Sequence, residues 1–176
     1  MYPSPAKLTL AQVVIRQATR ADLEALEWEG EFAHFRNMYL DTYHLAEAGR
    51  AIIWIAEKTE EGLIGQLFVS LIGGRPELAD GETRAYVFGF RVRPAFRNLG
   101  VGTRMMQTVE DDLHERGFRM VTLNVARVNH SARRFYERLG YRVVANEPGV
   151  WSYRDQYGIR QEVHEPAWRM EKALRR

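Results

Sequence analysis

The chain contains no cysteine among its 176 residues. This absence excludes disulfide bonds, thiolate metal ligands and cysteine nucleophiles, and it fits a cytoplasmic protein. The five histidines include no H-E-x-x-H or comparable pair, so we expect no metal site. No apolar run approaches the roughly 18 to 20 residues that cross a bilayer, and residues 1–10 lack the layout of a signal peptide. We therefore expect one cytoplasmic domain spanning residues 1–176, with no membrane partner.

An excess of charge of either sign is also missing. The 25 Lys and Arg residues nearly balance 23 Asp and Glu residues, for a formal net charge of +2. This charge is too mild to predict a nucleic-acid partner, and the chain shows no stacked-aromatic RNA motif or recognition helix. Arg91, Arg93, Arg97 and Arg104 nevertheless bracket one glycine-containing stretch. They form either an ordinary solvated surface or a local positive field for an anion.

Hydrophobic periodicity indicates alternating elements along the chain. The early strands are joined by short turns, and the later ones alternate with helices, which predicts an α/β or α+β mixed sheet covered on both faces. The segment 147–165 is polar and contains glycine, so we expect a long connection or an irregular hairpin there. The predicted strands are 13–18, 51–58, 63–72, 83–92, 119–126, 141–146 and 166–174, and the clearest predicted helices are 100–117 and 129–140.

Two helices are expected between the first two strands. Thr19 and Asp22 have the spacing of a capping box, which predicts a helix continuing through Leu26. A second helical pattern follows, with aromatic residues spaced to share one face. Such a stripe usually belongs to the core, but part of it could line a pocket. Its members are Trp28, Phe32, Phe35, Tyr39 and Tyr43.

The strand 83–92 carries an internal glycine, Gly89. A glycine inside a strand suggests a bulge or a close backbone approach. Strict alternation along this strand places four apolar side chains on one face of the sheet. Those four residues are Tyr86, Phe88, Phe90 and Val92.

Gly100 and Gly102 open the helix that follows this strand. A helix start exposes backbone N–H groups and the positive end of the helix dipole, and glycine removes the bulk that would keep a phosphate away. The stretch therefore predicts a pyrophosphate cradle, with Arg97 as an additional cation. The Lys-Ser/Thr of a nucleotide P-loop is missing, and Met105 occupies the place of the third glycine of a dinucleotide fingerprint. ATP and NAD are therefore disfavoured.

Two stretches together resemble the GNAT superfamily of N-acetyltransferases. F-R-V-R-P-A-F-R-N-L-G-V-G-T, residues 90–103, is similar to the superfamily's acetyl-CoA motif, and L-N-V-A-R-V-N-H-S-A-R-R-F-Y-E-R-L-G-Y, residues 123–141, is similar to its second motif. The resemblance implies a central mixed, mostly antiparallel sheet of about six to seven strands, with helices on both faces. It also implies that the fourth and fifth strands splay apart, with the acetyl-CoA co-substrate in the opening.

The resemblance assigns site residues position by position. Backbone groups of Phe90, Arg91 and Val92 would pair with the pantetheine arm, and Asn129 would hydrogen-bond the co-substrate near its thioester. Tyr136 would be the general acid that protonates the departing thiolate, although it also falls in an ordinary apolar stripe of its helix. The pyrophosphate would be bound by Arg97, Asn98, Leu99, Gly100, Val101, Gly102 and Thr103.

The implied reaction is direct attack of a primary amine, of a small molecule or of a protein or peptide, on acetyl-CoA. An amine with a pKa near 10.4 costs about 4 to 5 kcal/mol to neutralise at pH 7, so a proton acceptor is needed. Asn124 replaces the glutamate that some superfamily members carry on the equivalent strand. Glu82 acting through a water is one candidate base, and an enzyme of low activity that takes already neutral amine is an open alternative. Glu29, Glu31 and His34 are rivals. A non-catalytic acyl-CoA-binding sensory module is the alternative function, and pairing through a strand edge makes a homodimer possible.

Overall fold

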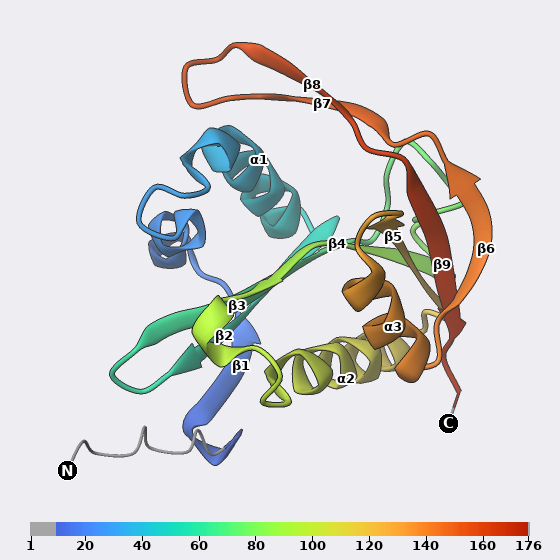
Figure 1. The fold of residues 1–176 in the computed structure, drawn as a ribbon, viewed down its shortest axis with the longest axis horizontal. Coiled ribbons are helices and arrows are strands. Elements are labelled where there is room, and N and C mark those ends of the chain that lie inside the picture. Colours follow the sequence, from blue (N-terminus) through green and yellow to red (C-terminus); the bar gives the residue numbers. More distant parts are fainter. Residues whose placement is uncertain (1–9, 176) are drawn as a thin grey trace.

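The computed structural model describes residues 10–175, in which a seven-stranded sheet is the central layer (Figure 1). The strand order is β1-β2-β3-β4-β5-β9-β6, and every neighbouring pair is antiparallel except the parallel pair β4 and β5. The expected mixed, mostly antiparallel sheet is thus confirmed. Its strands are β1 (Val13–Gln17), β2 (Ala51–Lys58), β3 (Gly62–Ser70), β4 (Arg84–Val92), β5 (Met120–Ala126), β6 (Arg142–Glu147) and β9 (Ala167–Ala173).

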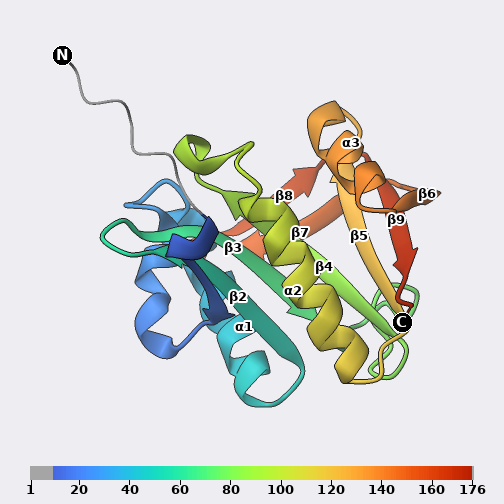
Figure 2. The same cartoon turned by 90° about the horizontal axis from the view of Figure 1, so that it is seen from below.

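Helices cover both faces of this sheet, as expected. Helix α1 (Arg36–Glu47) packs on one face, whereas α2 (Val101–Glu115) and α3 (His130–Arg138) lie on the other (Figures 1 and 2). Each face buries its own apolar core. The larger core takes the stripe of α2, where Met105 and Val109 are fully buried, and the smaller core contains Tyr39 of α1 against Phe68 of β3.

The segment before α1 differs from the prediction. The Thr19 capping box is present, but it opens only the short 3-10 turns η2 (Arg20–Asp22) and η3 (Glu24–Glu27). The helical path ends there because Trp28, Glu29 and Gly30 adopt left-handed conformations, with φ of 48°, 55° and 103°. A third turn, η4 (Ala33–Phe35), leads into α1. The predicted single helical stripe from Trp28 to Tyr43 is therefore wrong in its first half.

A tertiary hydrogen bond holds this left-handed corner in place. The indole nitrogen of Trp28 donates to Oε1 of Gln66 over 2.8 Å, and the Gln66 amide nitrogen donates to the Leu26 carbonyl over 3.3 Å. Gln66 lies in β3 and has no exposed surface. Because a buried amide must find partners, Gln66 ties the corner to the centre of the sheet.

A β-bulge interrupts β4 at Gly89. Gln66 of β3 faces Arg91 and Phe68 faces Phe88, so two residues of β4 oppose one of β3. The bulge reverses the alternation: Phe88 packs with the α1-side core, whereas Phe90 and Val92 pack with the α2-side core. The prediction that Tyr86, Phe88, Phe90 and Val92 share one face is therefore wrong, and the bulge suggested by Gly89 is confirmed.

The two central strands separate after a short parallel contact. Residues Arg84–Val87 of β4 pair with Met120–Leu123 of β5, yet β4 continues to Val92 and β5 to Ala126. Beyond the last pair, no strand of residues 10–175 lies beside the edge of β4 that would face β5. The expected splay between the fourth and fifth strands is thus confirmed.

The connection between β6 and β9 forms a hairpin of β7 (Val150–Arg154) and β8 (Arg160–His164), which arches over α1 (Figure 1). Asn37 of α1 donates to the Asp155 carbonyl over 2.7 Å, and the Phe35 and Tyr153 rings lie 4.9 Å apart. The hairpin and α1 therefore enclose an aromatic region on one face of the sheet. Among residues 10–175, no helix has the length and apolar character to span a membrane.

Candidate functional site

A cleft of about 580 Å³ lies where β4, the start of α2 and one side of α3 meet. Its volume is within the range of pockets that hold small ligands. The cleft brings together most of the site residues predicted from the sequence. Leu99 and Val101 do not line it, because Leu99 is largely exposed and Val101 is buried in the core. The predicted residues that line it are Phe90, Arg91, Val92, Arg97, Asn98, Gly100, Gly102, Thr103, Asn129 and Tyr136.

The start of α2 has no side-chain cap. Gly100 is its N-cap residue, in a left-handed conformation with φ of 88°, and it can provide no capping oxygen. Within the described residues, the backbone N–H groups of 98–103 have no hydrogen-bond acceptor, and the first bonded amide is that of Arg104, which donates to Gly100. By contrast, α3 is capped by Asn129, whose side chain accepts from the Ala132 amide over 3.1 Å. The donors at the start of α2 therefore remain available to an anion.

The space in front of these donors depends on Gly102. A Cβ atom at this position would lie 3.3 Å from the Phe135 ring and 3.4 Å from the Phe90 ring, closer than normal carbon contacts. The glycine thus allows both rings to line the cleft directly beside the exposed amides. Free N–H groups, a helix N-terminus and missing side-chain bulk together fit a diphosphate.

Arg97 places a cation at the edge of the cleft. Its Nε donates to the carbonyl of Val92, the last residue of β4, over 2.8 Å. This bond holds the guanidinium between the strand end and the start of α2.

Tyr136 reaches the cleft from α3. Its side chain is almost completely buried, and burial raises the pKa of its hydroxyl, with a further rise from the nearby Tyr86. The phenol is therefore protonated at neutral pH and can act as a proton donor.

The sequence identifies Asn124 only as a missing base and Tyr86 only as a strand residue, and the structure adds their surroundings. Burial raises the pKa of Tyr86, while Arg75 and the Asn124 side chain oppose the rise. Asn124 is the first residue of β5 beyond the parallel pairing, and its Oδ1 is buried without a hydrogen-bond partner in the described chain. A buried amide oxygen without a donor is unusual and marks a place for a ligand or water N–H or O–H group. The alternation of strand 83–92 was the available signal for Tyr86.

The structure separates Glu82 from these groups. Glu82 is exposed and precedes β4, on the side of Tyr86 away from the cleft. Glu82 thus lies beyond the first residue of β4, whereas the opening lies beyond Val87, where the pairing with β5 ends. The role of Glu82 as the base stays a prediction that its position outside the cleft does not support.

The other candidates for the base, Glu29, Glu31 and His34, lie in three different surroundings. Glu29 forms an ion pair with Arg93, with oxygen to nitrogen distances of 2.8 and 2.9 Å, and this pairing lowers its pKa. Glu31 lines the cleft but is exposed. The His34 ring packs 4.2 Å from the Phe35 ring. None of the three forms a described hydrogen bond with Tyr136.

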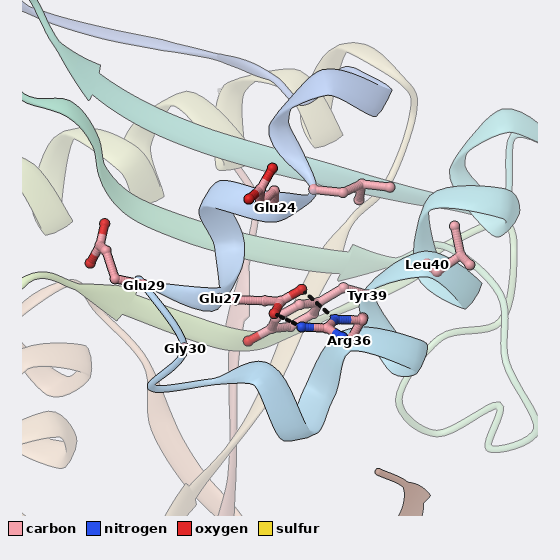
Figure 3. Close-up of a pocket in the computed structure, with 8 residues that line it drawn as sticks. Glu24, Glu27, Glu29, Gly30, Arg36, Tyr39 and Leu40 are labelled. Carbon is pink, nitrogen blue, oxygen red and sulfur yellow. Dashed lines mark hydrogen bonds and ion pairs between the residues drawn. The ribbon is translucent and has the colours of Figure 1, made fainter. Parts of the chain in front are cut away.

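A second cleft lies on the outer side of the corner before α1 (Figure 3). Glu24, Glu27 and Glu29 line it, which makes it acidic, and Arg36 neutralises Glu27 across a distance of 2.8 Å. It contains no residue of α2 or α3. Its acidity and position make it unsuitable for a diphosphate, so the cleft at the start of α2 is the candidate site.

Comparison with known proteins agrees with this geometry. The model of the Acetyltransferase (GNAT) family matches residues 15–141. A curated relative, the probable N-acetyltransferase camello of Xenopus tropicalis, is 29% identical over 131 residues, which are 68% of this chain and 56% of the relative. The chain thus spans about half the length of the curated relatives that it matches.

Solved structures share the fold across nearly the whole chain. Ard1 from Thermoplasma volcanium superposes with a TM-score of 0.72 at 19% identity, covering 94% of this chain and 99% of its own. NAA60 of Arabidopsis thaliana, solved in complex with acetyl-CoA, gives a TM-score of 0.70 at 20% identity, covering 92% and 98%. Because the family model covers well over half of the residues and the fold agrees, this chain belongs to the GNAT family of acetyltransferases.

Proposed function

We propose that the protein is an acetyl-CoA-dependent N-acetyltransferase that acts on a primary amine. The observation that carries the proposal is the uncapped start of α2. Its N–H groups from Asn98 to Thr103 have no acceptor in the described chain, and Asn98, Gly100, Gly102 and Thr103 line the same cleft as the open edge of β4. Membership of an acetyltransferase family and the solved acetyl-CoA complex of NAA60 support the same ligand.

The chain supplies separate groups for each part of the co-substrate. The amides of residues 98–103 and the Arg97 guanidinium would bind the diphosphate. The unpaired edge of β4 at Phe90, Arg91 and Val92 would hydrogen-bond the pantetheine arm as a neighbouring strand does. The side-chain oxygen of Asn129, Oδ1, caps α3 by accepting from the Ala132 amide. The side-chain NH₂ group of Asn129 is therefore the part that would bind near the thioester.

Tyr136 would act on the leaving group. In the reaction, the nitrogen of a neutral amine forms a bond to the thioester carbonyl carbon, and the bond from that carbon to sulfur breaks. The nitrogen releases one proton to solvent water as the amide forms, and solvent returns a proton to Tyr136. Tyr136 carries its proton at neutral pH, as a phenol of ordinary or raised pKa does, so it would donate that proton to the departing sulfur. Asn124 Oδ1, which lacks a donor, would accept a hydrogen bond from the amine and hold it in place.

The test is release of free thiol from acetyl-CoA in the presence of a panel of amines. Tyr136→Phe should lower kcat about 100-fold while acetyl-CoA affinity stays within about twofold, since only the hydroxyl is lost. Tyr141→Phe is the matched control. It removes another buried hydroxyl from the same core, one that donates to Glu110 over 3.1 Å and lies away from the cleft. Equal turnover in the Tyr136 variant and the parent would refute the acid role.

One observation favours a second candidate, a non-catalytic acyl-CoA-binding module. An amide, Asn124, rather than a carboxylate stands where β5 enters the opening, so that position offers no strong base. The two candidates differ in one measurement. Tight acetyl-CoA binding with no thiol release for any amine would support the binding module, and release with any amine would exclude it.

A further inference from the structure

Arg91 carries its charge into the cleft on an aromatic support. Its guanidinium carbon lies 4.3 Å from the centre of the Phe32 ring and 5.4 Å from that of Phe35. The side chain is half-buried and lines the same cleft as the start of α2. Among residues 10–175, no carboxylate lies within ion-pair distance of it.

The other two arginines in β4 or directly after it, Arg84 and Arg93, each have a carboxylate partner. Arg84 pairs with Glu171 over 3.0 Å, and Arg93 forms a double hydrogen bond with Glu29. Arg93 also lies over an aromatic ring, that of Trp28 at 5.1 Å. Aromatic support alone therefore does not explain a missing counter-ion at Arg91. A partly desolvated cation without an anion is unfavourable, and a ligand anion would correct this.

The Gly89 bulge decides which way Arg91 faces. Because the bulge reverses the alternation, Arg91 joins the α1 side of the sheet, opposite to Phe90 and Val92. The α1 side also carries the aromatic region under the β7–β8 hairpin, where Phe35 contacts the Trp151 and Tyr153 rings. The cation thus lies beside an apolar, aromatic surface.

We propose that Arg91 binds the carboxylate of the acceptor, so that the acceptor is an amino acid with an apolar or aromatic side group. The carboxylate would pair with the guanidinium, and the side group would lie against the ring of Phe32, which lines the same cleft. This inference rests on the proposed acetyltransferase function and names its substrate class.

The coenzyme diphosphate is the other anion that could reach a guanidinium in this cleft. Two observations favour the acceptor. The exposed amides at 98–103 already provide donors for the diphosphate, and Arg97 supplies a cation beside them. Phe90, which contacts the glycine of that cradle, projects to the opposite face of β4 from Arg91. The cradle and Arg91 therefore serve different ligands.

The experiment compares acceptors that differ only in the carboxylate. Thiol release from acetyl-CoA is measured with phenylalanine, tryptophan and leucine, each beside its amide. The readout is the ratio of kcat/KM for the acid over that for the amide, determined for the parent, Arg91→Gln and Arg93→Gln. We expect the ratio to fall at least tenfold in Arg91→Gln, to recover partly in Arg91→Lys and to stay within twofold in Arg93→Gln. Comparing ratios cancels the different basicities of the two amines.

Each other outcome has a definite meaning. An unchanged ratio in Arg91→Gln overturns the inference, and so does a parent that acetylates other amines but none of these amino acids. A large loss of acetyl-CoA affinity in Arg91→Gln with an unchanged ratio would assign the cation to the diphosphate. If no amine supports thiol release in the parent, the proposed function fails rather than the substrate assignment. Urea denaturation of each variant identifies a loss that comes from unfolding.

Discussion

Replacing Gly89 by alanine tests the feature that orients the site. Gly89 has a φ of 61°, and a Cβ atom there would lie 2.5 and 2.9 Å from two carbons of the Phe68 ring. That ring cannot move away easily. It is buried and lies 5.3 Å from the Tyr39 ring and 5.4 Å from the Phe88 ring, stacked against both.

The cost of this substitution has two parts. A non-glycine residue in the left-handed region costs about 1 kcal/mol. Overpacking a well-filled core adds about 1 to 3 kcal/mol. We therefore expect Gly89→Ala to lower the free energy of unfolding by about 2 to 4 kcal/mol. For a chain of this size, each kcal/mol lowers the melting temperature by about 2 to 4 °C.

Urea denaturation followed by circular dichroism measures the change. Gly74→Ala is the matched control, because Gly74 has nothing within 4 Å of its Cβ position and no left-handed φ. The control should unfold within about 0.5 kcal/mol of the parent, as most surface substitutions do. The Gly89 variant should also bind acetyl-CoA more weakly, since the bulge sets the direction of Phe90. A Gly89→Ala protein as stable as the control would refute the argument.

Three further predictions concern buried polar groups. Gln66→Leu leaves an indole N–H and a carbonyl without partners, so urea denaturation should show a loss of about 1 to 3 kcal/mol; an unchanged midpoint would contradict this. Burial raises the pKa values of Tyr39, Tyr136 and Tyr141. Their contribution to the free energy of unfolding should therefore be constant below about pH 10 and should fall above it, because the tyrosines of the unfolded chain then ionise. Ultraviolet absorbance should then show these phenols ionising only with unfolding, and not in the folded protein near pH 10. Glu147→Ala should be more destabilising than Glu77→Ala in the same urea assay, because Glu147 is buried between two arginines whereas Glu77 is exposed; equal midpoints would argue against this.

Much of the fold was predictable because it depends on local periodicity. The strands at 83–92 and 119–126 and the helix after Gly100 lie within one or two residues of their predicted ranges. The corner at Trp28 was not predictable. Left-handed conformations at Trp28 and Glu29 are locally unfavourable, and they persist through the contact of Trp28 with Gln66, which is distant in the sequence.

The candidate site divides in the same way. The exposed amides after Arg97 follow from two glycines at a helix start, and Tyr136 follows from the spacing of a short motif. The faces of the sheet on which Phe90 and Arg91 lie depend on the bulge at Gly89. Simple alternation along the strand ignores this bulge and therefore assigns both residues to the wrong faces. The distance of Glu82 from the opening depends on where β4 and β5 separate, which is a property of the pairing rather than of either strand.

The central claim is that backbone donors at the start of α2 bind the diphosphate of acetyl-CoA. The most direct measurement is calorimetric titration of acetyl-CoA into the parent, Gly100→Glu and Gly117→Glu. Both glycines have left-handed φ values, 88° and 94°, and they flank opposite ends of the same helix, so backbone strain is matched. We predict that Gly100→Glu weakens binding at least tenfold, while Gly117→Glu stays within twofold of the parent. Equal affinities in the two variants would contradict the account.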